Sequence, residues 1–229
     1  MIYYIGLSIL SNNDKSLKKQ SSVEARRILS NFENRNINEN DFSNEAGGRP
    51  FFPDKDVDFN ISHSGNIVAV SYISKKNIRV GCDIEKVKPR KNIAKIAKDK
   101  FSDSEYKYLN SNGIFSDKNF IKLWTLKECF IKLRGLSVFD MTNIPSFIKH
   151  NEEDKTFDFS FCGNTEKMLT FRLYELSNNN NDTGAENTNY ILAEGIEGEY
   201  LKPEIIWLSP SSLTLDCKRI AEIKTVPIL

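Results

Sequence analysis

The sequence predicts an α+β protein made of two loosely similar halves. Short runs rich in β-branched and aromatic residues occur in both halves of the chain. Apolar residues recur at helical spacing in Ser21–Phe32 and in Phe120–Gly135. The C-terminal third consists mostly of strand-like runs. Because strands and helices follow each other in a similar order twice, we expect two related units rather than one continuous layer.

The composition allows a globular core and gives no global electrostatic signal. With 229 residues, of which 39% are hydrophobic, the chain can bury one good-sized core or two small ones. It has 32 Lys and Arg against 31 Asp and Glu. This balance gives no reason to expect nucleic acid or a membrane as partner, so partners must be inferred from local charge.

Cysteine usage and the N-terminus favour a cytoplasmic location. Cys82, Cys129, Cys162 and Cys217 are widely spaced and form no CxxC pair. Such spacing fits reduced thiols better than a disulfide framework or a zinc site. The first residues, MIYYIGLSIL, are apolar but lack a basic leader. They predict a first strand rather than a signal peptide or a membrane span.

Five elements are expected before residue 78. In order they are a strand, a helix, a turn and two strands: Tyr3–Ile9, Ser21–Phe32, residues 47–50, Val57–Ile61 and Ile67–Ile73. Ser21 or Ser22 can cap the helix. The residues between the last two strands, Ser62-His63-Ser64-Gly65-Asn66, have hairpin chemistry, which predicts a strand-turn-strand unit.

The next elements are a strand at Ile78–Ile84 and a basic helix at Lys86–Lys100. Side chains alternate along a strand, so Asp83 and Glu85 should project from one face and Cys82 and Ile84 from the other. The basic helix has only a small apolar strip, and its natural partner is acidic. It is also compatible with an ordinary solvated face.

A capping box, Ser102-x-x-Glu105, predicts a short helix after the basic segment. Beyond residue 145 the expected strands are Ser146–His150, Thr156–Phe161, Met168–Leu176, Tyr190–Glu194 and Ile205–Leu208. The asparagine-rich stretch Ser177–Asn189 has the composition of a loop or a disordered segment, and we assign it no chemistry.

The helix Phe120–Gly135 places Trp124, Glu128 and Lys132 on one stripe, because each is four positions from the next. Apolar residues surround this stripe almost completely. Glu128 is therefore expected at the edge of a core, where a carboxylate needs a partner. The aromatic residues of this helix are expected to pack in the core.

Asp83, Glu85 and Glu128 form a possible group of three carboxylates. Neighbouring like charges raise each other's pKa unless a cation lies between them. Oxygen ligands favour a hard ion such as Mg²⁺, which also binds phosphates, so the group suggests phosphoryl chemistry. The alternative is two solvated acids on an edge strand and an ordinary helical ion pair between Glu128 and Lys132. Spacing alone favours this alternative.

Two further positions suggest an anion site. His63, flanked by Ser62 and Ser64, could hold a phosphate through imidazole, hydroxyl and backbone N–H groups. Alternatively, these polar residues satisfy their own turn. Arg49, between Gly48 and Pro50, also suits an anion, although a solvated arginine is the commoner case.

Five ordered motifs carry a family resemblance: GRPFFPD, FNISHSG, VGCDIE, FSDSEY and FIKLWTLKECFIKLRG. From about Gly48 to Ser137 the chain resembles the 4'-phosphopantetheinyl transferases of the surfactin-synthetase-activating type. The resemblance implies a fused pseudo-dimer of two α/β halves, each a small antiparallel sheet with a long helix, and an active site in the cleft between them. The expected halves are residues 1–77, which contact the phosphate and adenine of coenzyme A, and residues 78–229, which carry the metal and catalytic residues.

The implied reaction is transfer of 4'-phosphopantetheine from coenzyme A to a serine of an apo acyl or peptidyl carrier protein, as in antibiotic or lipid biosynthesis. The other product is adenosine 3',5'-bisphosphate. The resemblance makes Asp83, Glu85 and Glu128 the ligands of Mg²⁺, Glu128 also the general base, and Lys132 the group that stabilises the leaving phosphate. The implied contacts of coenzyme A are Lys18, Lys19, Arg49, Ser62, His63 and Lys132.

Three features depart from the family pattern. The usual K-x-x-G-x-G-L pattern is shortened after Lys132 to KLRGLS, beside the expected position of the pantetheine arm. Arg49 stands where lysine is common, and the region before the first helix is shorter than usual. We expect a monomer that docks its carrier protein on the basic segment 86–101.

Two rival functions remain open from the sequence. The first is a Mg²⁺-dependent hydrolase of coenzyme A or a nucleotide, built on the same carboxylates. The second is a catalytically silent scaffold that binds coenzyme A or a carrier protein. The full set of Asp83, Glu85, Glu128 and Lys132 argues against the scaffold, because binding alone does not need it.

Overall fold

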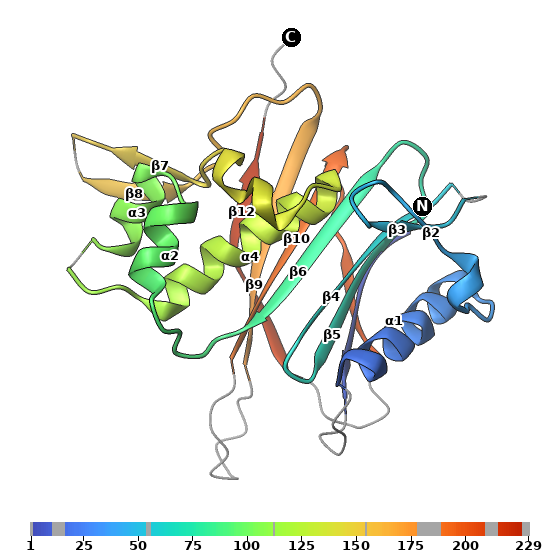
Figure 1. Cartoon of the computed structure of the whole chain (residues 1–229). Helices are drawn as coiled ribbons and strands as arrows, with labels where there is room; N and C mark the ends of the chain where they lie inside the picture. Colours follow the sequence, from blue (N-terminus) through green and yellow to red (C-terminus); the bar gives the residue numbers. More distant parts are fainter. Residues whose placement is uncertain are drawn as a thin grey trace.

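The structure, a computed structural model, describes residues 2–10, 17–53, 56–111, 113–153, 155–177, 189–208 and 215–225. The chain forms a mixed α+β fold, as predicted, with one long helix in each part (Figure 1). Up to residue 86 the elements are β1 (Tyr3–Ile9), α1 (Leu17–Glu33), η1 (Glu39–Asp41), β2 (Ser43–Asn44), β3 (Pro50–Phe51), β4 (Asp58–Ser64), β5 (Ile67–Ile73) and β6 (Arg79–Lys86). They are followed by α2 (Ile93–Lys100), α3 (Asp103–Leu109), α4 (Asp117–Arg134), η2 (Val138–Asn143), β7 (Ile148–Asn151), β8 (Thr156–Phe159), β9 (Met168–Ser177), β10 (Tyr190–Gly198), β11 (Glu204–Trp207) and β12 (Asp216–Lys224).

The two four-stranded sheets share the arrangement of three of their strands. Their strand orders are β11-β1-β5-β4 and β12-β9-β10-β6. In each sheet, one strand comes before the long helix and a hairpin comes after it. The second strand of the hairpin pairs with the strand before the helix, which gives the order β1-β5-β4 in one sheet and β6-β10-β9 in the other. The predicted division at residues 77 and 78 falls between β5 and β6. Strand β11 crosses that division, because it pairs parallel to β1 in the first sheet.

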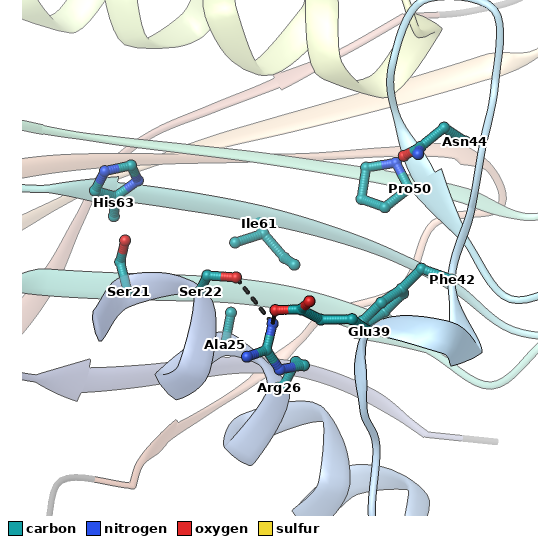
Figure 2. A pocket seen from close by; sticks show the side chains of 10 residues that line it. All are labelled: Ser21, Ser22, Ala25, Arg26, Glu39, Phe42, Asn44, Pro50, Ile61 and His63. Carbon is teal, nitrogen blue, oxygen red and sulfur yellow. Dashed lines mark hydrogen bonds and ion pairs between the residues drawn. The ribbon is translucent and has the colours of Figure 1, made fainter. Parts of the chain in front are cut away.

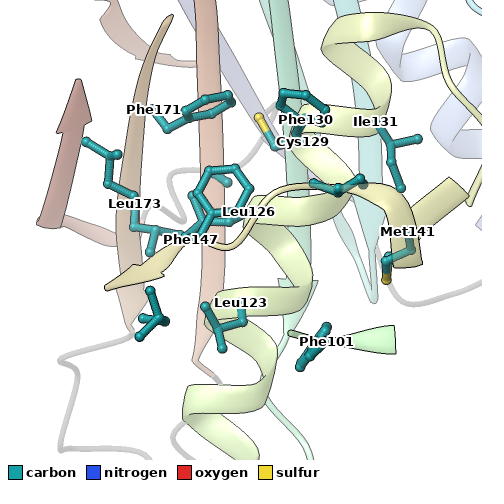
Figure 3. Close-up of a cluster of buried hydrophobic side chains, with 14 of the residues drawn as sticks. Phe101, Leu123, Leu126, Cys129, Phe130, Ile131, Met141, Phe147, Phe171 and Leu173 are labelled. Atoms are coloured by element: carbon teal, nitrogen blue, oxygen red, sulfur yellow. The ribbon is translucent and has the colours of Figure 1, made fainter. Parts of the chain in front are cut away.

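Three apolar clusters account for how the layers stack. On one side of the first sheet, Ile28 and Leu29 of α1 pack against Val68 and Val70 of β5. The largest cluster joins α4 to the second sheet and includes Leu126, Phe130, Phe147 and Phe171 (Figure 3). A further cluster lies between the sheets, where β1 and β5 meet β6, β9 and β10.

A row of side chains connects the two sheets at their edge strands, β4 and β6. Alternate residues of β4 accept hydrogen bonds of 2.7–3.2 Å from alternate backbone N–H groups of β6. The acceptors are Asp58, Asn60, Ser62 and Ser64, and the donors are Val80, Cys82, Ile84 and Lys86. We call these four contacts the β4–β6 ladder. It satisfies the N–H groups that an edge strand would otherwise leave without partners.

Local signals predicted several elements correctly. The bounds of β1 and β5 are the predicted ones. The capping box at Ser102 and Glu105 is present at the start of α3. Helix α4 begins at Asp117, three residues before its predicted start, and Gly135 ends it with a positive φ of 66°.

Other predictions about the elements were wrong. Helix α1 begins at Leu17, so Ser21 and Ser22 lie inside it rather than at its N-cap. The basic stretch is not one helix from Lys86, because β6 extends to Lys86 and α2 begins only at Ile93. Pro89 lies between them, and a proline disfavours helical geometry in the residue before it.

The hairpin is tighter than expected. Ser64 pairs with Ile67, so only Gly65 and Asn66 form the turn, and Gly65 has φ +54°. His63 therefore belongs to strand β4, not to a turn. Strands β2, β3 and β12 were not predicted. The asparagine-rich residues 178–188 lie outside the described residues.

Within the described part of the chain, no helix is long and apolar enough to cross a membrane. All four cysteines are free thiols, and Cys82 and Cys129 are buried.

The contact of Arg49 with the ladder predicts a large effect on stability. Both terminal nitrogens of Arg49 donate to Asp58, at 2.8 and 2.6 Å, and the arginine side chain is 4% exposed. Asp58→Ala removes the two-nitrogen contact of this buried charge and leaves only Glu45, 3.8 Å from Nη1, as an anionic partner, so we expect a loss of about 3 kcal/mol in the free energy of unfolding, measured in urea. Asp56→Ala is the control, because Asp56 is 71% exposed. Equal, small losses for both variants would contradict the assignment.

Candidate functional site

The site lies where α4 passes over β6. Cys82 and Ile84 of β6 point into the cluster between the sheets. Because strand side chains alternate, Asp83 and Glu85 project from the opposite face, the one that α4 covers. The Nζ atom of Lys132 on α4 lies 2.6 Å from Oδ1 of Asp83, which fixes the relative position of helix and strand. The predicted alternation is therefore confirmed.

Ser62 completes a three-residue contact between the two sheets. Its hydroxyl donates to Asp83 Oδ1 at 2.7 Å and accepts from Lys132 Nζ at 2.9 Å. It also accepts the backbone N–H of Ile84 as part of the β4–β6 ladder. Ser62, Asp83 and Lys132, which come from β4, β6 and α4, thus share one hydrogen-bond network.

Glu128 is the unpaired member of the group. It lies one turn before Lys132 and is half-buried, but no hydrogen bond or ion pair joins it to any described residue. The ordinary helical ion pair between Glu128 and Lys132 is therefore wrong for this structure, since Lys132 pairs with Asp83. A carboxylate in this position is available for a ligand or a proton.

The electrostatics of the site follow from this unequal pairing. Burial, and next the negative charge of Asp83, raise the pKa of Glu128 to about 7, although Lys132 opposes the shift. Burial alone would lower the pKa of Lys132, but the adjacent Asp83 outweighs it and raises that pKa above its usual range. The site thus combines a fixed ammonium group with a carboxyl group that titrates near neutral pH.

Glu85 has two partners, neither of which the sequence indicated. Ser64 Oγ donates to its Oε2 at 3.0 Å, and Nη2 of Arg90 lies 3.1 Å from the same oxygen. Arg90 is one of many basic residues in its segment. No signal in the sequence distinguishes it, because the loop after β6 determines where its side chain lies.

The donor set suits a hard divalent cation, although its members are not gathered around one point. Among the described residues, no group of three His, Cys, Asp or Glu lies close enough to hold a metal ion. However, Oδ2 of Asp83 is buried and has no hydrogen-bond partner. A buried anionic oxygen without a donor is costly unless a cation satisfies it. Together with the unpaired Glu128, this orphaned oxygen is compatible with Mg²⁺.

His63 lies apart from this network, on the other face of β4. It is exposed and lines a cavity of about 410 Å³ between α1, η1 and β4 (Figure 2). Ser21, Ser22 and Arg26 line the cavity from α1, and Ile61 belongs to the same strand as His63. Ser62 and His63 therefore lie in different environments, on opposite faces of β4. The sequence had instead predicted that both belong to one turn.

Arg49 is buried behind the site. Besides Asp58, it donates to the carbonyl oxygens of Lys132 and Val80, at 3.0 and 2.9 Å. It lines a second cavity, of about 220 Å³, together with Gly47, Lys132 and Gly135. A Cβ atom on Gly47 would lie 2.1 Å from the carbonyl oxygen of Gly135, so only glycine allows this loop to approach the end of α4.

Lys18 and Lys19 belong to the first turn of α1. The side chain of Lys19 is exposed, and that of Lys18 lies outside the described residues. Their roles in binding stay predictions, as do those of Arg49 and His63.

The comparisons with known proteins point to one family. The sequence model of the 4'-phosphopantetheinyl transferase superfamily matches residues 79–192, which include Asp83, Glu85, Glu128 and Lys132. The 4'-phosphopantetheinyl transferase Sfp of Bacillus subtilis (strain 168) is 42% identical over 100 residues, which cover 41% of each chain. AcpT of Escherichia coli (strain K12), a 4'-phosphopantetheinyl transferase, is 33% identical over 105 residues, 44% of this chain and 52% of that protein.

The chain is similar to the 4'-phosphopantetheinyl transferase superfamily over residues 79–192. It spans about half the length of the curated relatives that it matches. The matched region contains β6, α4 and β9, so it covers the metal and catalytic candidates but not Ser62 or His63.

The raised pKa of Glu128 predicts how stability depends on pH. The unfolded chain releases this proton near pH 4.5 and the folded chain near pH 7, so the unfolding free energy falls between these values, by roughly 1.4 kcal/mol per pH unit. Glu128→Gln cannot ionise. In EDTA, we expect the variant to be more stable than the wild type at pH 8 and to lose this advantage by pH 5, as measured by urea unfolding. The same difference at both pH values would contradict the assignment.

Proposed function

We propose that the chain transfers the 4'-phosphopantetheine group from coenzyme A to a serine of an apo acyl or peptidyl carrier protein. The products are holo carrier protein and adenosine 3',5'-bisphosphate. The observation that carries this proposal is the contact of Lys132, Asp83 and Ser62 beside an unpaired Glu128. It combines a base, a cation and an orphaned carboxylate oxygen in a region that matches the transferase superfamily.

The two halves are proposed to act as a fused pseudo-dimer, with the active site in the cleft between residues 1–77 and 78–229. The repeated strand order, β1-β5-β4 and β6-β10-β9, supports this arrangement. So does the position of Ser62, which brings the first sheet to the carboxylates of the second.

The chemistry assigned to the residues follows from their charges. Glu128, with a pKa of about 7, is half-ionised near neutral pH and can accept the proton of the carrier serine as it attacks phosphorus. Lys132 stays protonated beside Asp83 and can stabilise the charge on the departing phosphate. A Mg²⁺ ion held by Asp83, Glu85 and Glu128 would neutralise the diphosphate of coenzyme A.

Coenzyme A is proposed to bind with its 3'-phosphate and adenine toward the first half. The cavity beside His63 supports this, because its wall combines an imidazole, two hydroxyls and apolar side chains with the guanidinium of Arg26, which pairs with Glu39 of the same wall at 3.1 Å. Lys18, Lys19, Arg49 and Ser62 are the other proposed contacts. Arg49 would have to exchange some of its present hydrogen bonds, to Asp58, Lys132 and Val80, for a contact with coenzyme A.

The carrier protein is proposed to dock on residues 86–101. Lys91, Lys95 and Lys98 are exposed. The spacing of Lys95 and Lys98 places them on one side of α2, and Lys91 lies just before the N-cap of this helix, Asn92. Such a surface suits an acidic partner and would speed its approach. We further propose that the protein acts as a monomer in the cytoplasm.

One experiment separates the proposed function from its rivals. The protein is incubated with coenzyme A, Mg²⁺ and an apo carrier protein, and the carrier is weighed by mass spectrometry. A mass gain of one phosphopantetheine group supports the transferase. Cleavage of coenzyme A without a modified carrier would indicate a hydrolase, and an unchanged mixture would indicate a binding protein.

Glu128→Gln should remove most of the activity in this assay. The substitution keeps the volume of the side chain but removes its ability to accept a proton, so we expect a decrease of at least about a hundredfold in the rate. Glu153→Gln is the control, because Glu153 is exposed in the turn between β7 and β8 and lines neither of the two cavities described above. A near-wild-type rate for Glu128→Gln would exclude Glu128 as the base.

Replacing Lys91, Lys95 and Lys98 together by glutamine should slow carrier modification at low salt and reduce its salt dependence. The matched control replaces three lysines outside the segment: Lys76, Lys167 and Lys202. The basic segment is not the docking surface if both triple variants modify the carrier at the wild-type rate.

A further inference from the structure

We propose that Arg90 is an internal counter-ion of Glu85 that competes with a divalent cation, so that it lowers the metal affinity of the site. The inference rests on the proposed function, because it concerns the same carboxylates. It adds a residue to the site that neither the sequence motifs nor the family match singles out.

Arg90 is held in place rather than free to move at the surface. Its side chain is 23% exposed, and its Nη2 lies 3.1 Å from Oε2 of Glu85. The guanidinium also lies over the rings of Phe120 and Trp124, at 5.9 and 5.8 Å from their centres. Its backbone N–H donates to Oδ1 of Asp117, the first residue of α4, at 3.0 Å. Contacts with α4 therefore direct this positive charge at Glu85.

The pairing of the carboxylates explains why the charge matters. Asp83 is paired with Lys132 and Glu85 with Arg90, whereas Glu128 forms no ion pair with any described residue. The charges of two of the three proposed metal ligands are thus already neutralised by basic side chains of the protein. A divalent cation must displace or tolerate these charges, and repulsion between cations a few ångströms apart remains strong in a half-buried site.

Arg90 is a competitor rather than a support for Glu85. The same Oε2 atom also accepts a hydrogen bond from Ser64 Oγ, at 3.0 Å, and Ser64 is fixed by the β4–β6 ladder. Glu85 therefore keeps a partner that orients it when Arg90 is removed. Loss of the positive charge should then leave Glu85 in its position and make the site as a whole more negative by one charge.

The test measures metal binding without coenzyme A or carrier protein. Mn²⁺ serves as the probe, and free Mn²⁺ is followed by electron paramagnetic resonance during titration. Arg90→Met keeps an unbranched apolar stem against Phe120 and Trp124 but removes the charge. We expect it to bind Mn²⁺ about fivefold more tightly than the wild type, or better. Arg90→Lys keeps the charge and should stay within about twofold of the wild type.

Arg134→Met is the matched control. Arg134 also pairs with a glutamate, Glu197 at 2.7 Å, and lies over a ring, that of Phe130 at 5.8 Å. Because it pairs outside the carboxylate group, its loss should not change the affinity for Mn²⁺. As a second readout, Mg²⁺ should raise the melting temperature of Arg90→Met more than that of the wild type or of Arg134→Met.

Weaker or unchanged Mn²⁺ binding by Arg90→Met, with the wild type binding normally, overturns the inference and leaves the transferase assignment intact. Absence of Mn²⁺ binding in all of the proteins overturns both the inference and the proposed metal site. Whether the chain is a transferase is decided separately, by the mass of the carrier protein after incubation with the wild type.

Discussion

The β4–β6 ladder is the contact on which the position of the site depends. Four short polar side chains of β4 replace the strand that would otherwise pair with the edge of β6. A main-chain pairing would have merged the two sheets into one. Side-chain acceptors instead keep the sheets separate but in fixed register, and one of the four, Ser62, also reaches Asp83 and Lys132. The same hydroxyl therefore serves the connection between the sheets and the arrangement of the charges.

Contacts between neighbours in sequence were predictable, whereas contacts across the fold were not. The capping box at Ser102 and Glu105 and the alternation of Asp83 with Cys82 follow from local geometry, so the sequence predicted both correctly. However, Glu105 also forms a buried ion pair with Lys127, at 3.0 Å. That partner lies on α4, and only the tertiary packing of α3 against α4 brings the two together.

The same limit applies to the candidate site. The shared stripe of Glu128 and Lys132 was predictable from helical spacing, but the true partner of Lys132 is Asp83, on another element. The placement of His63 failed for a different reason. The SHSG motif has turn residues, yet the two-residue turn at Gly65 and Asn66 leaves its first three members in β4. The pairing of β4 with β5 determines which face of the sheet His63 occupies. The turn propensity of the residues around it could not predict that pairing.

Strand β11 has a consequence for how the chain can be synthesised and folded. It pairs with β1 through residues 204–207, so one edge of the first sheet is contributed by a strand that is made after β9 and β10 of the second sheet. Until then β1 has an open edge, and such edges promote association with other chains. Contacts so distant in sequence also form slowly, since a long loop must close first. The first sheet is therefore completed only after most of the second sheet, β6, β9 and β10, has been made.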